Sequence, residues 1–456
     1  MSKLQRKHRF HVSGSTVVAR PARTVATGFA ITILTGGLLL ASPLSSSTGQ
    51  WTPFIDALFT ATSAVCVTGL AVLDTATHFS VFGKIVIIAL IQAGGLGIML
   101  VASLFSLSIL GKLSLRAKIT AQTEAKAVEG PNVKNAALSI VKVTFTIEGI
   151  IAVLLAARFI LGYGYSFGEG LAYGGFHAIS AFNNAGFALF SDNLVGFASD
   201  PWICIPIAAA IILGGLGFPV ILQIRRYARN RLKWSMNTKI VLVGTVALLL
   251  LGTVFITAME WANPDTLGPM SVQDKLLAGF FQSVQTRTAG FNSINIGDMH
   301  SATWLGMDLL MFIGAGPAGT GGGIKITTFA VLFFIILTEL RGEAAVNIFG
   351  KRLSRSVHRQ AITVALVAVA AVFTGTMALL VITEFTLDEC LFEATSAFAT
   401  VGLSTGITPE LPATGEAVLI ALMYLGRVGV LSLGSALALR DKKAVFELPK
   451  ERPAIG

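Results

Sequence analysis

One eleven-residue pattern, which begins with phenylalanine and ends with glycine, occurs four times along this chain. The copies read FTATSAVCVTG at 59–69, FHAISAFNNAG at 176–186, FFQSVQTRTAG at 280–290 and FEATSAFATVG at 392–402. Their final glycines are 117, 104 and 112 residues apart, so each copy has its own long stretch of chain. Glycines that only pack helices together recur at Gly-x-x-x-Gly spacing instead. Repetition of this kind predicts four related structural units.

Most of the chain is apolar. Hydrophobic residues make up 54% of it and charged residues 13%, whereas a soluble domain has roughly 45–50% apolar residues. Several stretches without charge approach or reach the roughly 20 residues that a helix needs to span a bilayer. These stretches are 25–41, 203–222, 240–257 and 361–383. The sequence therefore predicts a multi-pass protein surrounded by membrane lipid.

The net charge of +10 raises the question of nucleic-acid binding, and the placement of the charges argues against it. Of the 34 lysines and arginines, 28 fall in five segments: 1–24, 111–142, 223–239, 339–359 and 440–456. By the positive-inside rule these segments face the cytoplasm, which places both termini there and the protein in the cell (inner or plasma) membrane. Most acidic residues lie outside them. This favours an acidic outer mouth that attracts cations, although acids are also simply tolerated at outer positions.

The basic segments also predict the boundaries of the units. Because they all face inward, each stretch between them crosses the membrane an even number of times, and the units share one orientation. We expect cytoplasmic tails at 1–24 and 440–456, and repeats at 25–111, 112–227, 228–340 and 341–439. The three cysteines, Cys66, Cys204 and Cys390, show neither a disulfide pattern nor a metal-binding pattern.

Each repeated glycine follows a segment that is too short to cross the membrane as a helix. Irregular backbone at membrane depth is tolerated where it lines a water-filled path or is covered by protein, so a pore is the simplest explanation. A short helix ending there would direct its partial negative charge at a cation. Glycine would allow carbonyl oxygens to turn toward the ion. The predicted fold is an all-α membrane protein with four helix–pore loop–helix (M1-P-M2) repeats around one central pore.

The predicted selectivity filter contains no carboxylate, which favours a large monovalent ion over a divalent one and potassium only weakly over sodium. Backbone carbonyls would bind the ion, potassium rather than sodium if this weak preference holds, and no other metal or cofactor is expected in the chain. The twelve filter residues are Val67, Thr68, Gly69, Asn184, Ala185, Gly186, Thr288, Ala289, Gly290, Thr400, Val401 and Gly402.

On the motifs TSAVCVTGL, SAFNNAGF, TRTAGFN and SAFATVGLST, the chain resembles the Trk/Ktr/HKT superfamily of potassium transporters from about residue 25 to 439. Its length and short tails most resemble the bacterial KtrB membrane subunits. The resemblance implies that each repeat supplies a quarter of one filter and that glycine in all four goes with potassium. It also implies a homodimer on a separate cytoplasmic nucleotide-binding ring similar to KtrA. Whether sodium is a coupling or activating ion stays open.

The third repeat departs from the others. After its filter it reads GAGPAGTGGGIK at 314–325, where a continuous helix is improbable. Part of this stretch matches a dinucleotide-binding fingerprint, but its flanks are membrane-length apolar segments rather than a strand and a helix. By analogy with the family we expect a flexible gate loop below the filter, and a passive kink is the alternative. The gate residues expected are Gly314, Gly316, Gly319, Gly321, Gly322, Gly323, Lys325 and Arg427.

Basic residues inside the membrane zone are costly, so they are functional candidates. Arg287 lies three residues before a filter glycine, and we expect it to support the filter from behind, through Glu393 or another pore-helix acid. Lys325 and Arg427 are candidates for a positive barrier near the gate, or else for charges that reach the inner membrane surface.

Two other function classes fit less well. A secondary transporter for an anion would present helix N-termini to its ligand, whereas the short helices here precede their glycines and offer C-termini. Such folds also often contain inverted repeats, and these repeats share one orientation. An enzyme would need a catalytic constellation, and the six scattered histidines form neither HExxH nor a nucleophile elbow.

Overall fold

The computed structural model describes residues 15–111 and 133–429. The predicted C-terminal tail and most of the link between the first two repeats lie outside these residues. The first helix begins at Ser15, so the last part of the segment predicted as an N-terminal tail is helical.

Within the described residues, the four repeats share the predicted order of a long helix, a short pore helix and an inner helix. The long first helices are α1 (Ser15–Ala41), α5 (Val133–Tyr163), α9 (Met236–Glu260) and α13 (Arg355–Ile382). The pore helices are α2 (Phe54–Cys66), α6 (Phe167–Phe182), α10 (Val272–Gln285) and α14 (Leu387–Ala399). The predicted all-α fold with four helix–pore loop–helix units is confirmed.

The inner helices differ from repeat to repeat. In repeat 1 the inner helix is one piece, α3 (Val81–Gly111). In repeats 2 and 3 it is divided into α7 (Pro201–Leu216) with α8 (Phe218–Arg226), and α11 (Ser301–Phe312) with α12 (Ile326–Leu340). In repeat 4, α15 (Ala413–Tyr424) continues into a π-helical turn at Leu425–Gly429.

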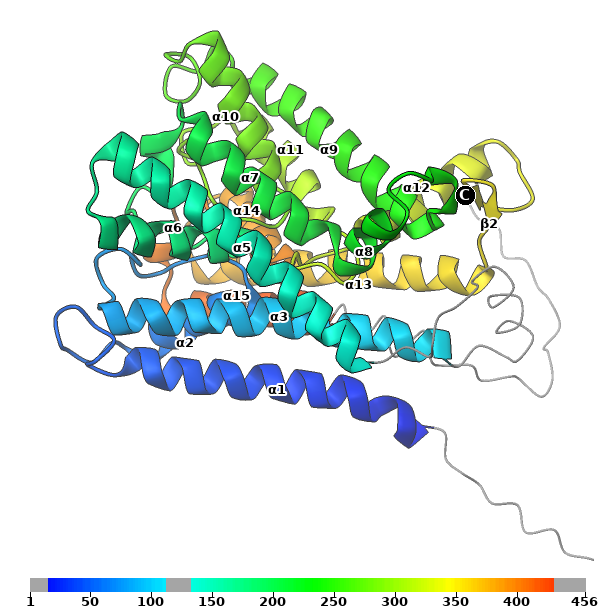
Figure 1. The fold of residues 1–456 in the computed structure, drawn as a ribbon, viewed down its shortest axis with the longest axis horizontal. Coiled ribbons are helices and arrows are strands. Elements are labelled where there is room, and N and C mark those ends of the chain that lie inside the picture. The colour runs from blue at the N-terminus through cyan, green and yellow to red at the C-terminus, as the bar shows by residue number, and fades with distance from the viewer. Residues whose placement is uncertain (1–14, 112–132, 430–456) are drawn as a thin grey trace, which may run out of the picture.

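The remaining elements are short. Single 3-10 turns lie at Val195–Phe197, Arg231–Lys233 and Thr408–Glu410, and a hairpin of β1 (Asn347–Ile348) and antiparallel β2 (Lys351–Arg352) joins α12 to α13. Figure 1 shows α1, α3 and α5 alongside one another, and the hairpin and α12 toward the opposite end of the molecule from α2 and α6.

Local sequence signals explain where the pore helices begin. Ser166 and Glu169 form a capping box at the start of α6, and Thr386 and Glu389 do so at α14. Ser271 caps α10 by accepting a hydrogen bond from the Asp274 backbone N–H. These contacts satisfy N–H groups that have no partner inside the helix.

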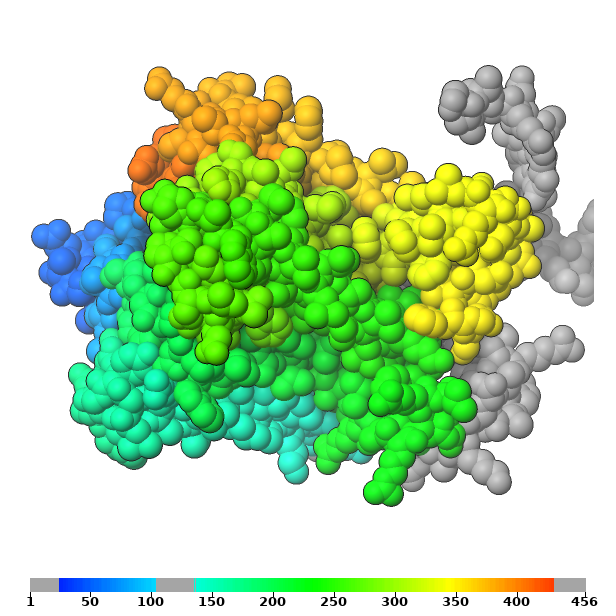
Figure 2. Space-filling view, turned by 90° about the horizontal axis from the view of Figure 1, so that it is seen from above, coloured from blue at the N-terminus to red at the C-terminus, as the bar shows by residue number. Residues whose placement is uncertain are grey.

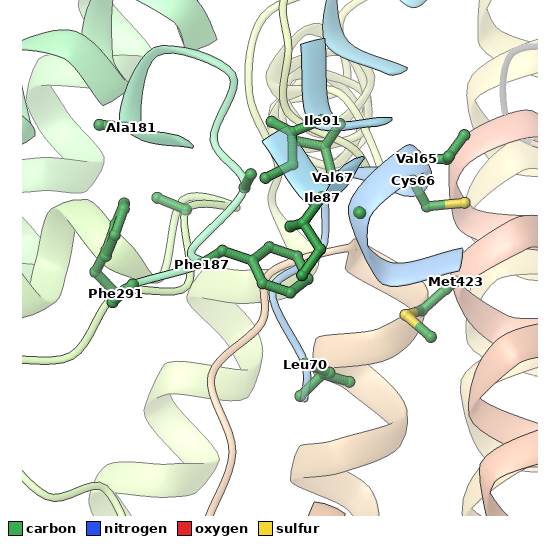
Figure 3. Close-up of a cluster of buried hydrophobic side chains, with 14 of the residues drawn as sticks. Val65, Cys66, Val67, Leu70, Ile87, Ile91, Ala181, Phe187, Phe291 and Met423 are labelled. Carbon is green, nitrogen blue, oxygen red and sulfur yellow. The ribbon is translucent and has the colours of Figure 1, made fainter. Parts of the chain in front are cut away.

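Five helices of the described part are long and apolar enough to cross a membrane, and the bent pair α7 and α8 makes a sixth candidate. The apolar core that joins the repeats includes the residue after each of the first three filter glycines: Leu70, Phe187 and Phe291, all at most 2% exposed. Figure 3 shows these three side chains, from three different loops, within one cluster. The pore loops are therefore held by packing between repeats as well as within them.

Candidate ion-binding site

The four glycine-containing loops meet around one axis. Each glycine lies against the backbone carbonyl that precedes the glycine of the next repeat; a methyl group added to Gly69 would lie 2.5 Å from the Ala185 oxygen. The other contacts follow the same rule in chain order and close the ring: Gly186 with Ala289, Gly290 with Val401, and Gly402 with Thr68. The structure thus brings the four predicted filter glycines and the residues that precede them together in one cyclic arrangement.

The loops share an unusual backbone conformation. The glycines have φ angles of 100°, 69°, 78° and 95° in chain order. The residue two positions before each glycine is also left-handed: Val67, Asn184, Thr288 and Thr400, with φ between 51° and 68°. Left-handed β-branched residues are rare and strained, and such strain persists only where the surroundings enforce it, typically at functional sites.

Side chains of the pore helices hold this backbone in place. Ser63 and Ser396, each six residues before its glycine, accept hydrogen bonds of 3.0 Å from the N–H of Gly69 and Gly402. Ser180, at the same position of repeat 2, donates to the Phe187 carbonyl instead. These bracing residues were missed by the sequence analysis, although a serine at the same place in three of the four repeats was a signal that could have identified them.

Repeat 3 braces its loop differently. Val284 replaces the serine, and the neighbouring Gln285 accepts a 3.1 Å hydrogen bond from the Phe291 backbone N–H. The change of residue therefore changes the point at which the loop is attached to its pore helix.

The ring offers the chemistry of a cation site. The C-terminal ends of four pore helices approach it, and each carries partial negative charge. None of the twelve residues is acidic, so oxygen ligands would come from backbone carbonyls and hydroxyls. The buried hydroxyls of Thr68, Thr288 and Thr400 have no hydrogen-bond partner among the described residues.

Glycines of the inner helices allow the pore helices to approach closely. Gly94 lies against the carbonyl of Val65, four residues before the filter glycine of repeat 1. Gly214 meets Phe182, and Gly426 meets Phe398, at the same position of repeats 2 and 4. A side chain at any of these three glycines would push the pore helix away.

The glycine-rich segment of repeat 3 lies directly beside the ring. A methyl group on Gly321 would collide with the Thr288 hydroxyl, and one on Gly322 would collide with the Thr400 hydroxyl. Thr320 donates a 2.9 Å hydrogen bond to the Asn184 side chain. The segment therefore contacts three of the four left-handed filter residues, and a larger side chain at Gly321 or Gly322 would not fit.

The segment is fixed at several points. Two backbone hydrogen bonds join its ends. The Gly314 N–H donates to the Ile324 carbonyl at 2.8 Å, and the Ile326 N–H donates to the Ala315 carbonyl at 3.1 Å. Lys325 donates to the Gly321 carbonyl within the segment. Arg427, on the inner helix of repeat 4, donates to the Thr320 carbonyl. The two predicted basic gate residues are thus both attached to the segment.

The glycine-rich segment also forms hydrogen bonds with the inner helix of repeat 2. The backbone N–H groups of Gly316 and Thr320 donate to the carbonyls of Gly215 and Gly214, at 2.8 and 3.1 Å. Here α7 and α8 meet at 95°, with Gly217 at a φ of 87° between them. The break in repeat 2 is a finding of the structure.

Arg287 does not contact Glu393, and this suggested pairing is wrong. Arg287 is 7% exposed and donates a 3.3 Å hydrogen bond to the Gly314 carbonyl, at the start of the glycine-rich segment. Glu393 accepts hydrogen bonds from Ser404, Thr405 and Thr408, and so braces the loop after the fourth filter glycine. The two residues belong to different repeats: Arg287 lies just after α10, whereas Glu393 lies within α14.

A cavity of about 320 Å³ opens above the first two loops, lined by Gly69, Gly186 and the residues that follow them. Asp74 lies in its wall and accepts a 2.6 Å hydrogen bond from Ser191 of repeat 2. Partial burial acts to raise the pKa of Asp74, but hydrogen bonds from Ser191, Thr77 and the Ala76 backbone outweigh it and lower the pKa below its usual value. A carboxylate thus lies in the wall of this cavity.

Comparison with known proteins matches residues 13–444 to the family described as TrkH, cation transport protein. The Ktr system potassium uptake protein B of Bacillus subtilis is 40% identical over 429 residues, which cover 93% of this chain and 94% of that protein. The protein of the same name from Vibrio alginolyticus is 39% identical over 436 residues, with 95% and 94% covered.

The Potassium/sodium uptake protein NtpJ of Enterococcus hirae is 36% identical over 442 residues, covering 96% of this chain and 97% of the relative. The crystal structure of the potassium transporter TrkH from Vibrio parahaemolyticus superposes with a TM-score of 0.70 at 18% identity, over 94% of this chain and 86% of that one, which supports the fold. This chain is an integral membrane protein that belongs to the Trk/Ktr family of cation transport proteins, and not an enzyme.

Proposed function

We propose that this chain is the potassium-translocating membrane subunit of a Ktr-type uptake system, with its pore at the four-loop ring. The observation that carries the proposal is the closed cyclic contact between each filter glycine and the next repeat's carbonyl. Relatives 36–40% identical over nearly the whole chain are named potassium or potassium/sodium uptake proteins.

In this proposal a potassium ion enters from the mouth beside Asp74 and loses water as carbonyl oxygens of the ring replace its hydration shell. Neutral carbonyls suit a weakly hydrated monovalent ion, because acidic ligands would hold a cation too tightly to release it. The twelve filter residues therefore act mainly through their backbone. The pore-helix C-termini contribute a favourable potential without adding a full charge.

The glycine-rich segment at 314–325 is the gate of this pathway. It lies against Thr288 and Thr400 of the filter and is joined to Asn184 through Thr320. Arg427 and Lys325 hold it there and add positive charge that opposes a cation below the filter. Arg287 supports the filter indirectly, because it ties the loop of repeat 3 to Gly314.

The partners follow from the relatives. Proteins named as parts of a Ktr system imply further components, and we propose a homodimer of this chain on a cytoplasmic nucleotide-binding ring similar to KtrA. Both termini would lie on the cytoplasmic side, with the basic hairpin at 347–352. Sodium is proposed as a coupling or activating ion, in line with the name of the Enterococcus relative.

The test is potassium-limited growth and potassium uptake in a cell that lacks its own uptake systems, with this chain expressed alone and with a KtrA-like partner. Restored uptake that is lost in Gly290→Asp and keeps its rate in Gly175→Ala is the expected result, because a methyl group at Gly175 meets no atom within 4 Å. Gly69→Ser and Gly290→Ser should each reduce discrimination against sodium. Unchanged selectivity in both would remove these glycines from the filter.

A further inference from the structure

A wide apolar groove runs along repeat 3, between α9, α11 and α12. It encloses about 590 Å³, and every residue that lines it is apolar or glycine. Figure 2 views the molecule from the side on which repeat 3 (green) lies, with the segment that contains the hairpin (yellow) at one end. None of the predicted filter residues and no residue of the segment 314–325 lines this groove.

The groove faces the surroundings of the protein rather than its core. Val243 and Leu251 of α9 are 58% and 65% exposed, and Leu309 of α11 is 63% exposed. Because α9 is long and apolar enough to span a membrane, these side chains lie at the depth of the hydrocarbon. Ala247, Gly244 and Gly306 contribute little side-chain volume to the lining, so the groove has room for an occupant.

One end of the groove is basic. Phe349, at the hairpin, is the last lining residue, and the Lys239 ammonium lies 5.9 Å from the centre of its ring. Lys351 and Arg352 follow in β2 and are exposed. Among the described residues the recorded ion pair is Arg158 with Asp200, so these three cations have no carboxylate partner there. An apolar channel with a cationic end matches a lipid that has an acyl tail and an anionic headgroup.

We propose that this groove is a binding site for an anionic glycerophospholipid of the inner leaflet, and that the bound lipid holds the gate segment beneath the filter. One acyl chain lies along α9, and the phosphate meets Lys239, Lys351 and Arg352. Basic residues beside the inner leaflet attract anionic headgroups electrostatically.

The coupling to the gate follows from the two residues that flank the gate segment. Ile313 and Ile326 both line the groove, and Ile313 pairs with Ile324 across the base of the segment. A tail that fills the groove packs over the side chains that cover Ile313 and Ile326, which are themselves 4% and 1% exposed, and hence stabilises the segment between them. This half of the proposal rests on the proposed function, whereas the lipid site itself does not.

The binding test measures the phosphatidylglycerol bound per chain by native mass spectrometry, after purification from vesicles of phosphatidylethanolamine with and without phosphatidylglycerol. Ala247→Trp fills the groove, and the double variant Lys239→Gln/Lys351→Gln removes charge at its end. Each should reduce bound phosphatidylglycerol at least fivefold. The matched controls, Ala370→Trp on the exposed face of α13 and Arg229→Gln outside the groove, should leave it unchanged.

Equal binding in all four variants would overturn the site, and so would equal retention of phosphatidylethanolamine and phosphatidylglycerol. A second copy of the chain is the competing occupant. It would be revealed if Leu309→Cys formed a disulfide-linked dimer in the membrane, and that result would also overturn the lipid site.

The flux test uses the same vesicles with the chain alone. Phosphatidylglycerol should lower potassium flux about threefold in the unmodified chain and should have no effect in Lys239→Gln/Lys351→Gln. If binding is lost but flux responds as in the unmodified chain, the coupling to the gate is wrong and the site stands. If the unmodified chain shows no potassium flux in either lipid, the proposed function fails while the binding result remains valid.

Discussion

The inner helices of repeats 1 and 2 contain the same four residues, Gly-Gly-Leu-Gly, and fold differently around them. In repeat 1, residues 94–97 lie inside the continuous helix α3. In repeat 2, residues 214–217 end α7, and the chain turns by 95° into α8. The first glycine has the same task in both, since Gly94 and Gly214 each meet a pore-helix carbonyl. The fourth glycine does not, because Gly97 is helical and Gly217 has a φ of 87°.

The difference comes from the surroundings of the motif. Pro219 follows two residues after Gly217, and proline has no N–H to continue a helix and clashes with the preceding turn. The glycine-rich segment of repeat 3 then pairs with the backbone at the break: the Phe218 N–H donates a 3.3 Å hydrogen bond to the Ala318 carbonyl. A glycine cluster thus permits a break, and a neighbouring proline together with a partner segment determines whether the break forms.

Substitution of the fourth glycine in both repeats is the strongest test of this difference. Gly217→Ala should abolish uptake and destabilise the protein by roughly 2 kcal/mol or more, because a left-handed alanine costs about 1–2 kcal/mol and its methyl group would collide with the Pro317 carbonyl. Gly97→Ala should be tolerated, because a methyl group there meets no atom within 4 Å. Potassium uptake and thermal unfolding in detergent measure both effects.

If Gly97→Ala and Gly217→Ala behaved alike, the two copies of the motif would have the same conformation in the membrane, and the break in repeat 2 would not be a feature of the working protein. Measuring the amount of protein in the membrane separates loss of folding from loss of transport.

Much of this architecture follows from the sequence, because spacing and charge report on long-range organisation. The glycine at the end of each of the four repeated motifs predicted one ring, and in the structure the four glycines form a closed cycle of contacts. The left-handed conformation of Val67 could not be predicted, because valine disfavours it and only packing in the folded protein enforces it. The break at Gly217 was missed because its motif is identical to that of repeat 1.

The charged candidates show a similar limit. Lys325 is part of the predicted gate segment and donates to the Gly321 carbonyl, and Arg427 of repeat 4 donates to the Thr320 carbonyl. The suggested pairing of Arg287 with Glu393 was wrong, because a single sequence does not show which of several buried acids lies behind which loop. Glu393 satisfies its carboxylate with local hydroxyl and N–H groups instead.

A second prediction concerns the segment that fills the break in repeat 2. Deletion of residues 320–322 removes the contacts with Thr288 and Thr400 and should raise partner-free potassium flux at least fivefold, because the loss of even one hydrogen bond of about 1 kcal/mol corresponds to a factor of about five. Flux into proteoliposomes measures it. Unaltered flux would leave the segment a passive kink, and loss of sodium discrimination would show that it supports the filter instead.

A third prediction isolates one contact of this segment. Thr320→Val keeps the shape of the side chain but removes the donor to Asn184, a bond of 2.9 Å. Flux without the partner should rise about threefold, in line with a net hydrogen-bond contribution of about 0.5–1.5 kcal/mol to the closed arrangement.

The matched control is Thr328→Val, on the same inner helix but outside the segment, for which no rise is expected. If Thr320→Val lowered flux, the bond to Asn184 would stabilise the conducting arrangement, and the assignment of open and closed states would be reversed.

The smallest effect is expected where repeats 1 and 2 meet at the outer mouth. Asp74→Asn removes a carboxylate that Ser191 of repeat 2 contacts, and uptake at low external potassium should fall about twofold through weaker attraction of cations. The effect should shrink as ionic strength rises, because salt screens exposed charges. Uptake rates at two salt concentrations measure it.

The lowered pKa of Asp74 predicts how the effect of Asp74→Asn on uptake depends on pH. The hydrogen bonds to Asp74 lower its pKa, so the carboxylate is ionised above that lowered value and is neutralised only below the usual aspartate pKa of about 3.9. The twofold difference in uptake between the unmodified chain and Asp74→Asn should therefore stay constant between about pH 5 and 8. A difference that disappeared toward pH 5 would mean that Asp74 is protonated there, and that the contact with Ser191 does not hold the charge at the mouth.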